Sequence, residues 1–224
     1  MTQPSSPFKL AAVHDLKQAI KRWLPAKSPQ EKAARQFFAV RLTSDDVAID
    51  CGANVGKFTA HLARSGATVY AFEPNPHAFK VLEEQFAGAD NVHCMAKGVD
   101  RENGVTRLFL HENSDQDEVY WSTGSSLLEL KKNVKGDKFV DIATVDLCEF
   151  IDSLPQRVRL LKMDVEGVEC RILKKMIESG TVDKIDHIFV ETHDHKIPEL
   201  KPATDEIRQL IRDRELTHLN LDWT

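Results

Sequence analysis

Residues 50–56 combine a carboxylate, an amide and two glycines directly after a short apolar stretch. Gly52 permits a tight turn and a close approach of backbone to a ligand, while Gly56 lets a following helix pack near the same place. Ionised Asp50 only accepts hydrogen bonds, which suits a ligand ammonium group, and Asn54 both donates and accepts them. Backbone amides at the start of the helix would receive a ligand carboxylate. This loop, which includes Ala53, therefore predicts a site for a zwitterionic methionine moiety.

A second carboxylate, Glu73, follows the next apolar stretch 23 residues after Asp50, and Pro74 comes directly after it. A carboxylate at this place accepts hydrogen bonds from both hydroxyls of a ribose in other nucleotide-binding units. Helix caps and turn glycines are the alternative interpretation, which the joint spacing of these residues disfavours. The G-x-G-x-x-G fingerprint of nicotinamide-binding proteins is absent, because position 50 is Asp. We therefore expect S-adenosylmethionine as the cofactor, and methyl transfer rather than hydride transfer.

Acidic residues and a histidine in the C-terminal half are candidates for taking a proton from a hydroxyl nucleophile. Asp164 ends an apolar stretch and should point into the cleft beside the cofactor methyl group, so it is a candidate for both cofactor binding and catalysis. His193 has a near-neutral reference pKa and is the histidine base that we favour, with Asp164 an equal candidate and Glu191 a further one. Glu166 and Glu169 have a simpler interpretation as first-turn acids that the helix dipole stabilises.

The same region offers ligands for a metal ion. Glu191, His193 and His195 alternate along an extended segment and would lie on one side of it. Together with Asp164 and Asp194 they could hold a divalent cation, because carboxylates and imidazoles are competent ligands. Surface loops often carry such residues without binding an ion, so the sequence does not favour a metal and we expect none.

Short apolar stretches alternate with helical patterns along most of the chain, and this alternation predicts the elements that hold the candidate residues. Strands are expected at residues 47–50, 68–72, 92–95, 105–110, 139–145, 158–163, 187–190 and 217–221. Helices are expected at residues 31–41, 55–65, 76–86, 203–212 and from about 167 to 179. The alternation implies an α/β, Rossmann-like fold with a mostly parallel central sheet and helices on both faces. Because such sheets bind ligands at the carboxyl ends of their strands, the loops with the candidate residues should converge on one cleft.

One main domain at residues 42–224 is expected, preceded by an N-terminal helical arm at residues 1–41. Apolar residues recur at helical spacing over residues 10–23, and this helix would pack on the domain, cover the cleft as a lid or lie on a membrane surface. An irregular polar insertion near residues 111–138 would help to cover the cleft.

Charge and composition exclude several classes of protein. The formal net charge is −5, yet residues 1–41 carry eight Lys or Arg against two acidic residues, so the main body is acidic. We therefore expect no nucleic-acid partner, and only the basic arm leaves an anionic partner open. No apolar run approaches the roughly 20 residues that span a bilayer, and no secretory signal is found, so a cytoplasmic location is expected. The four cysteines are widely spaced, which argues against structural zinc and a disulfide framework.

Three blocks of sequence resemble the FkbM-type methyltransferases, which are class I methyltransferases: residues 50–56, residues 70–76 and, most specifically, residues 161–169. Residues 124–127 match a short serine-containing segment of that family weakly. The resemblance implies S-adenosylmethionine-dependent O-methylation of a small acceptor, commonly a sugar, a glycan or a secondary metabolite of the polyketide type. A nucleotide-dependent oxidoreductase and a binding protein without catalysis are the alternatives.

The end of the sheet departs from the family pattern. Class I methyltransferase sheets usually finish with two further strands, the last one antiparallel, whereas this sequence ends soon after the strand expected at residues 217–221. The closing strand is therefore either missing or supplied by the segments around Val105 and Phe139.

Overall fold

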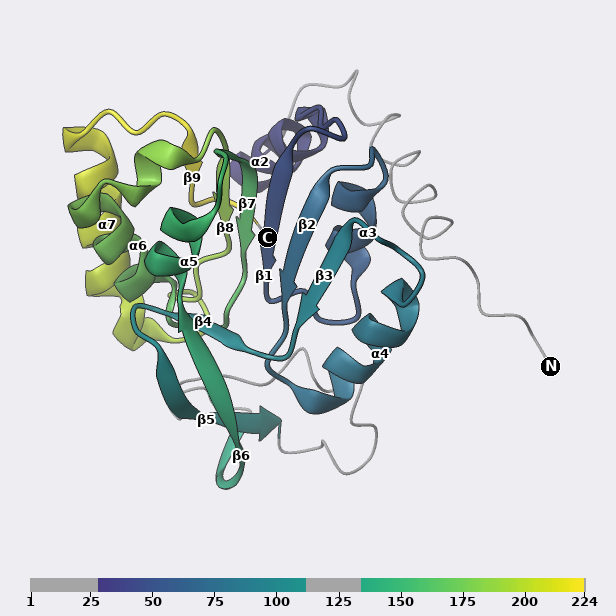
Figure 1. The fold of residues 1–224 in the computed structure, drawn as a ribbon. Coiled ribbons are helices and arrows are strands. Elements are labelled where there is room, and N and C mark those ends of the chain that lie inside the picture. Colours follow the sequence, from purple (N-terminus) through teal and green to yellow (C-terminus); the bar gives the residue numbers. More distant parts are fainter. Residues whose placement is uncertain (1–27, 112–133, 224) are drawn as a thin grey trace.

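Six strands form the central sheet of the computed structural model, which describes residues 28–111 and 134–223 (Figure 1). In spatial order they are β3 (Val92–Met95), β2 (Thr68–Phe72), β1 (Val47–Cys51), β7 (Val158–Met163), β8 (Ile188–Val190) and β9 (Leu219–Asn220). Every neighbouring pair is parallel. The fully buried β1 is typical of a parallel sheet covered on both faces, and it explains why this strand is so apolar in sequence.

Helices cover both faces of this sheet. On one side lie α2 (Pro29–Ala39), α3 (Lys57–Ala63) and α4 (Pro76–Phe86), and on the other α5 (Leu147–Ser153), α6 (Glu169–Ser179) and α7 (Lys201–Asp213), with short 3-10 helices at Thr181–Lys184 and Pro198–Leu200. The expected α/β, Rossmann-like fold is thus confirmed. α5 was not expected; Asp146 caps it by accepting hydrogen bonds from the backbone amides of Cys148 and Glu149.

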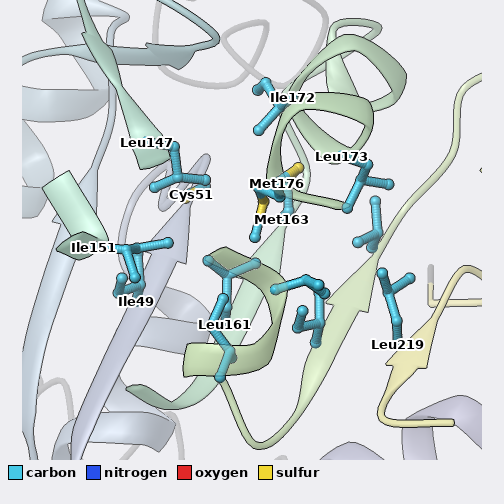
Figure 2. Close-up of a cluster of buried hydrophobic side chains, with 14 of the residues drawn as sticks. Ile49, Cys51, Leu147, Ile151, Leu161, Met163, Ile172, Leu173, Met176 and Leu219 are labelled. Atoms are coloured by element: carbon cyan, nitrogen blue, oxygen red, sulfur yellow. The ribbon is translucent and has the colours of Figure 1, made fainter. Parts of the chain in front are cut away.

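The two faces of the sheet bury separate clusters of apolar side chains. Ile49 and Leu161 pack against α5 and α6, whereas Ala48 and Leu160 face α2, α3 and α4. Figure 2 shows part of the first cluster. Because side chains alternate along a strand, position 50 of β1 and position 162 of β7 take the same face as Ala48 and Leu160.

Three further strands make a second, small sheet in the order β4, β6, β5. β4 is Gly98–Asp100, β5 is Gly104–His111 and β6 is Val134–Asp146, with β5 and β6 antiparallel. The expectation that the segments around Val105 and Phe139 supply a closing strand of the central sheet is therefore wrong. Val105 is 75% and Phe139 38% exposed, whereas strands inside the central sheet are covered on both faces. Within the described residues, the central sheet ends at β9, parallel to β8.

α2 packs closely on the main domain. Phe37 is fully buried, its ring centroid lies 4.3 Å from that of Trp223, and Ser28 caps the helix. The helix expected at residues 10–23 and the segment at residues 124–127 both lie outside the described residues. Among the helices described, none is long and apolar enough to cross a membrane.

Candidate active site

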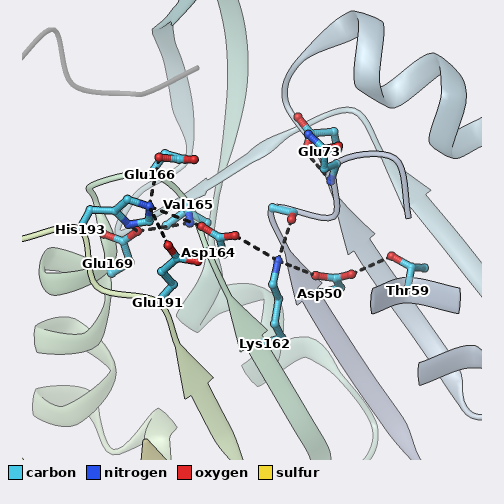
Figure 3. A network of polar contacts seen from close by, with 12 residues as sticks. Asp50, Thr59, Glu73, Lys162, Asp164, Val165, Glu166, Glu169, Glu191 and His193 are labelled. Atoms are coloured by element: carbon cyan, nitrogen blue, oxygen red, sulfur yellow. Dashed lines mark hydrogen bonds and ion pairs between the residues drawn. The ribbon is translucent and has the colours of Figure 1, made fainter. Parts of the chain in front are cut away.

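The carboxyl ends of four central strands are tied together by backbone hydrogen bonds. The amides of Gly52 and Ala53 donate to the carbonyl of Phe72, at 3.0 and 2.9 Å. The amide of Asp164 donates to Cys51, and that of Glu191 to Met163, both at 2.9 Å. These contacts bring the loops after β1, β2, β7 and β8 to one edge of the sheet, where the candidate residues lie (Figure 3).

The two glycines of the β1 loop are required by close packing within the protein. A Cβ at Gly52, which has φ +79°, would lie 1.8 Å from the carbonyl oxygen of Asp164. A Cβ at Gly56, with φ +88°, would lie 2.5 Å from the ring of Phe86 on α4. Gly52 thus allows the β7 loop to approach, a constraint that the sequence interpretation had assigned to a ligand, while Gly56 allows α3 to pack on α4.

Asp50 forms a buried network with a lysine that the sequence analysis did not single out. The two residues are register partners on β1 and β7. Nζ of Lys162 lies 3.3 Å from Oδ1 of Asp50, 3.8 Å from Oδ2 of Asp164, and donates to the carbonyl of Gly52 at 2.8 Å. Thr59 on α3 donates its hydroxyl to Oδ2 of Asp50 at 2.7 Å. Asp50 therefore has a cation beside it already, at the place where a ligand ammonium was expected.

Burial opposes the charge of Lys162, but the carboxylates of Asp50 and Asp164 outweigh it and raise the pKa of the lysine. Lys162 is thus the charge that holds the ends of β1 and β7 together. A lysine between the apolar residues Leu161 and Met163 was the sequence signal that could have revealed it, because a buried lysine requires a partner.

Glu73 joins the β1 and β2 loops. Its Oε2 accepts a hydrogen bond from the backbone amide of Asn54 at 2.7 Å, and its Oε1 accepts one from that of Asn75 at 2.8 Å. Burial raises the pKa of Glu73 to about 7, although these two hydrogen bonds oppose the shift. Asp50 and Glu73 are not helix caps, because the N-caps of α3 and α4 are Gly56 and Asn75.

His193, which follows β8, is surrounded by carboxylates. Its Nδ1 lies 2.8 Å from Oε1 of Glu169, and its Nε2 lies 3.0 Å from Oε2 of Glu166, 3.7 Å from Oδ1 of Asp164 and 3.8 Å from Oε1 of Glu191. Burial alone would lower the pKa of His193, but Glu166 and Glu169 outweigh it and raise this pKa to about 10. In this arrangement the imidazole is protonated at neutral pH, which argues against His193 as the general base.

Asp164 lies between Lys162 and His193, with 28% of its side chain exposed. Loss of hydration raises the pKa of Asp164 to about 6; Lys162 lowers it, and Glu191 and Glu166 raise it. A carboxylate with this pKa is ionised at neutral pH and is a stronger base than an ordinary aspartate. Glu191 accepts a hydrogen bond from Nζ of Lys196 at 2.9 Å.

The ring of His195 stacks beside that of His193, with centroids 6.3 Å apart, but the ligand atoms that meet here come from Asp164, Glu191 and His193. The chain turns after His193, whose carbonyl accepts hydrogen bonds from the amides of Lys196 and Ile197. Nδ1 of His195 lies 3.1 Å from the carbonyl oxygen of Thr192.

The sequence did not predict the burial of Glu169 or its contact with His193, because a role as a first-turn acid was sufficient to explain that residue.

The fold and the loops at this edge define a class I methyltransferase, with a mostly parallel sheet between two layers of helices. The family model described as the methyltransferase FkbM domain matches residues 50–216. The chain belongs to the FkbM methyltransferase family.

Three relatives illustrate the range of this similarity. The chain is 27% identical over 166 residues to "Methyltransferase 1" of Beauveria bassiana, covering 68% of this chain and 66% of the relative. It is 28% identical over 179 residues to the hexuronic acid methyltransferase AglP of Haloferax volcanii, covering 80% and 68%. It is 27% identical over 205 residues to the 31-O-demethyl-FK506 methyltransferase FkbM of Streptomyces tacrolimicus, covering 80% and 75%.

Proposed function

We propose that this protein transfers a methyl group from S-adenosylmethionine to a hydroxyl of a small acceptor, such as a sugar, a glycan or a secondary metabolite. The observation that carries the proposal is the joining of the β1 loop to Glu73 at the same sheet edge as Asp164, within the segment that matches the family. The hexuronic acid specificity in the name of one relative and the 31-O-demethyl acceptor in that of another support an oxygen acceptor, with a glycan as one option.

The residues of the β1 and β2 loops fit the proposed cofactor. Each oxygen of Glu73 accepts one backbone hydrogen bond, so each keeps a lone pair for a ribose hydroxyl. The predicted cofactor residues Asp50, Gly52, Ala53, Asn54, Gly56, Glu73, Pro74 and Asp164 belong to the loops that meet at this edge. Asp50 would act mainly by holding Lys162, and through it the loop, in position.

S-adenosylmethionine supplies a methyl group on a positively charged sulfur, which is a good leaving group. The loops at this edge would align the acceptor oxygen with that methyl group, and such alignment supplies much of the rate enhancement. The hydroxyl proton passes to a carboxylate, for which Asp164 is our choice because its pKa of about 6 leaves it ionised at neutral pH. Glu191 and the protonated His193 would orient the acceptor beside it.

Calorimetric titration with S-adenosylhomocysteine and, separately, with NAD tests the cofactor. We expect binding of S-adenosylhomocysteine alone, with a weaker affinity in Glu73→Gln and an unchanged one in Glu84→Gln, which alters an exposed glutamate of α4. Binding of NAD without S-adenosylhomocysteine would overturn the proposal. Transfer of labelled methyl groups to a panel of sugar and metabolite hydroxyls then identifies the acceptor.

A further inference from the structure

Three side chains from two loops of the candidate active site direct ligand atoms at one point. They are Asp164, after β7, and Glu191 and His193, after β8, and one ligand atom from each lies within 4.8 Å of the others. We propose that Asp164, Glu191 and His193 bind a divalent cation. The sequence did not favour a metal at these residues, so the tertiary arrangement carries this inference.

Unsatisfied buried atoms point to the same place. Among the residues that the structure describes, Nε2 of His193 and Oδ1 of Asp164 are buried and have no hydrogen-bond partner. They lie 3.7 Å apart, which is too long for a hydrogen bond between them, and the His193 side chain is fully buried. Oε2 of Glu166 lies 3.0 Å from Nε2 as an ion-pair contact (Figure 3). A buried polar atom without a partner costs about 1–3 kcal/mol, and a cation between the two would satisfy both.

The spacing of the three atoms suits metal coordination. Nε2 of His193 is 3.7 Å from Oδ1 of Asp164 and 3.8 Å from Oε1 of Glu191. A point equidistant from three atoms spaced in this way lies about 2.1 to 2.4 Å from each, within the range of bonds from divalent cations to nitrogen and oxygen.

Glu169 orients the histidine for this role. It accepts hydrogen bonds from the backbone amide of Gly167 at 3.0 Å and faces Nδ1 of His193 at 2.8 Å. Because a carboxylate only accepts, Nδ1 carries a proton toward Glu169, and Nε2 is directed toward Asp164 and Glu191. A bound cation would replace the proton that Nε2 carries in the absence of an ion. A carboxylate behind the second ring nitrogen is the usual support of a metal-binding histidine, since it fixes the tautomer and makes the ligand more basic.

Charge favours a cation at this position. Four carboxylates surround His193. Two of them have a lysine nearby: Lys162 lies 3.8 Å from Asp164, and Lys196 lies 2.9 Å from Glu191. Lys196 has 40% of its side chain exposed, so it can turn to solvent when an ion binds Glu191. The two carboxylates suit Mn²⁺ or Mg²⁺, whereas the imidazole is a ligand of transition metals, so Mn²⁺ fits the mixed set better than Mg²⁺ does.

With three protein ligands, the cation would keep positions for water or for acceptor oxygens. At such a position it would lower the pKa of the acceptor hydroxyl and fix its orientation. This catalytic role rests on the proposed function, whereas the binding of the ion does not.

Titration of chelator-treated protein with Mn²⁺ tests the site without cofactor or acceptor. Electron paramagnetic resonance measures binding as the loss of the signal from free Mn²⁺. We expect one Mn²⁺ per chain, displaced by excess Mg²⁺, and an affinity at least about 10-fold lower in Glu191→Gln and in Asp164→Asn. Glu199→Gln, which alters an exposed glutamate in the 3-10 helix Pro198–Leu200, is the matched control and should bind as the original protein does.

Circular dichroism melts establish that the variants are folded. Failure of the folded protein to bind Mn²⁺, or equal affinity in all three variants, would overturn the proposal. Neither result touches the cofactor titration, so failure of the metal site and failure of the methyltransferase proposal are distinguishable.

Discussion

Replacement of Lys162 by methionine should strongly destabilise the protein, because it leaves a buried carboxylate without its cation. Asp50 is fully buried, and the ammonium group of Lys162 lies 3.3 Å from its Oδ1. Removal of one partner of a buried ion pair costs about 3 to 5 kcal/mol. For a chain of this size that loss corresponds to a fall in melting temperature of roughly 6 to 20 °C.

The double variant Lys162→Met/Asp50→Asn separates the charge effect from lost packing. Methionine fills much of the volume of lysine, and asparagine removes the unpaired charge, so the double variant should recover much of the stability that Lys162→Met loses. Urea unfolding followed by circular dichroism measures the free energy of unfolding of all the variants. Lys184→Met is the control, because Lys184 contacts Asp152 at the surface with both side chains about half exposed, and it should unfold as the original protein does.

If Lys162→Met lowers the free energy of unfolding by less than about 1 kcal/mol, the reasoning is refuted, because an uncompensated charge at a fully buried position destabilises a protein by more than that. Equal losses in the single and the double variant would refute it as well, since packing alone would then explain the effect.

Further predictions concern the cofactor loops and catalysis. Affinity for S-adenosylhomocysteine should rise with pH through about 7. Ribose hydroxyls donate to ionised Glu73, and the raised pKa keeps this residue protonated below that pH. Calorimetry at several pH values measures the trend, and Glu73→Gln should abolish it. Gly52→Ala should lower the melting temperature, because its Cβ would collide with a carbonyl 1.8 Å away, whereas Gly88→Ala meets nothing within 4 Å and should not; equal melting temperatures would contradict the packing argument. Asp164→Asn should lower turnover by about 100-fold or more, with affinity for S-adenosylhomocysteine nearly unchanged, as expected for loss of a base. The reverse pattern in a methyl-transfer assay would reassign Asp164 to cofactor binding.

Local patterns were sufficient for most of the central sheet and its helices. Strands β2, β3 and β7 and helix α4 have the boundaries that the sequence predicts. The strands are short, mainly apolar stretches between helical patterns, and Asn75 marks the start of α4. The position of the candidate residues at one edge of the sheet was also predictable, since parallel strands place the residues after their carboxyl ends there.

The sequence did not predict the short elements β4 and α5 or the pairing of the strands in the second sheet. β4 has three residues and α5 seven, which is too short for a periodic pattern to stand out. Strands β5 and β6 pair with each other rather than with the central sheet, and no local signal distinguishes these two arrangements.

The electrostatics of the site were decided by tertiary structure alone. The sequence predicted a charged Asp50 and a titratable His193, but the partners of both come from elsewhere in the chain. The register of β1 and β7 puts Lys162 beside Asp50, and the turn after β8 places His193 among carboxylates from the β7 loop and α6. A pKa depends on burial and on charges within a few ångströms, and neither quantity exists until the chain has folded.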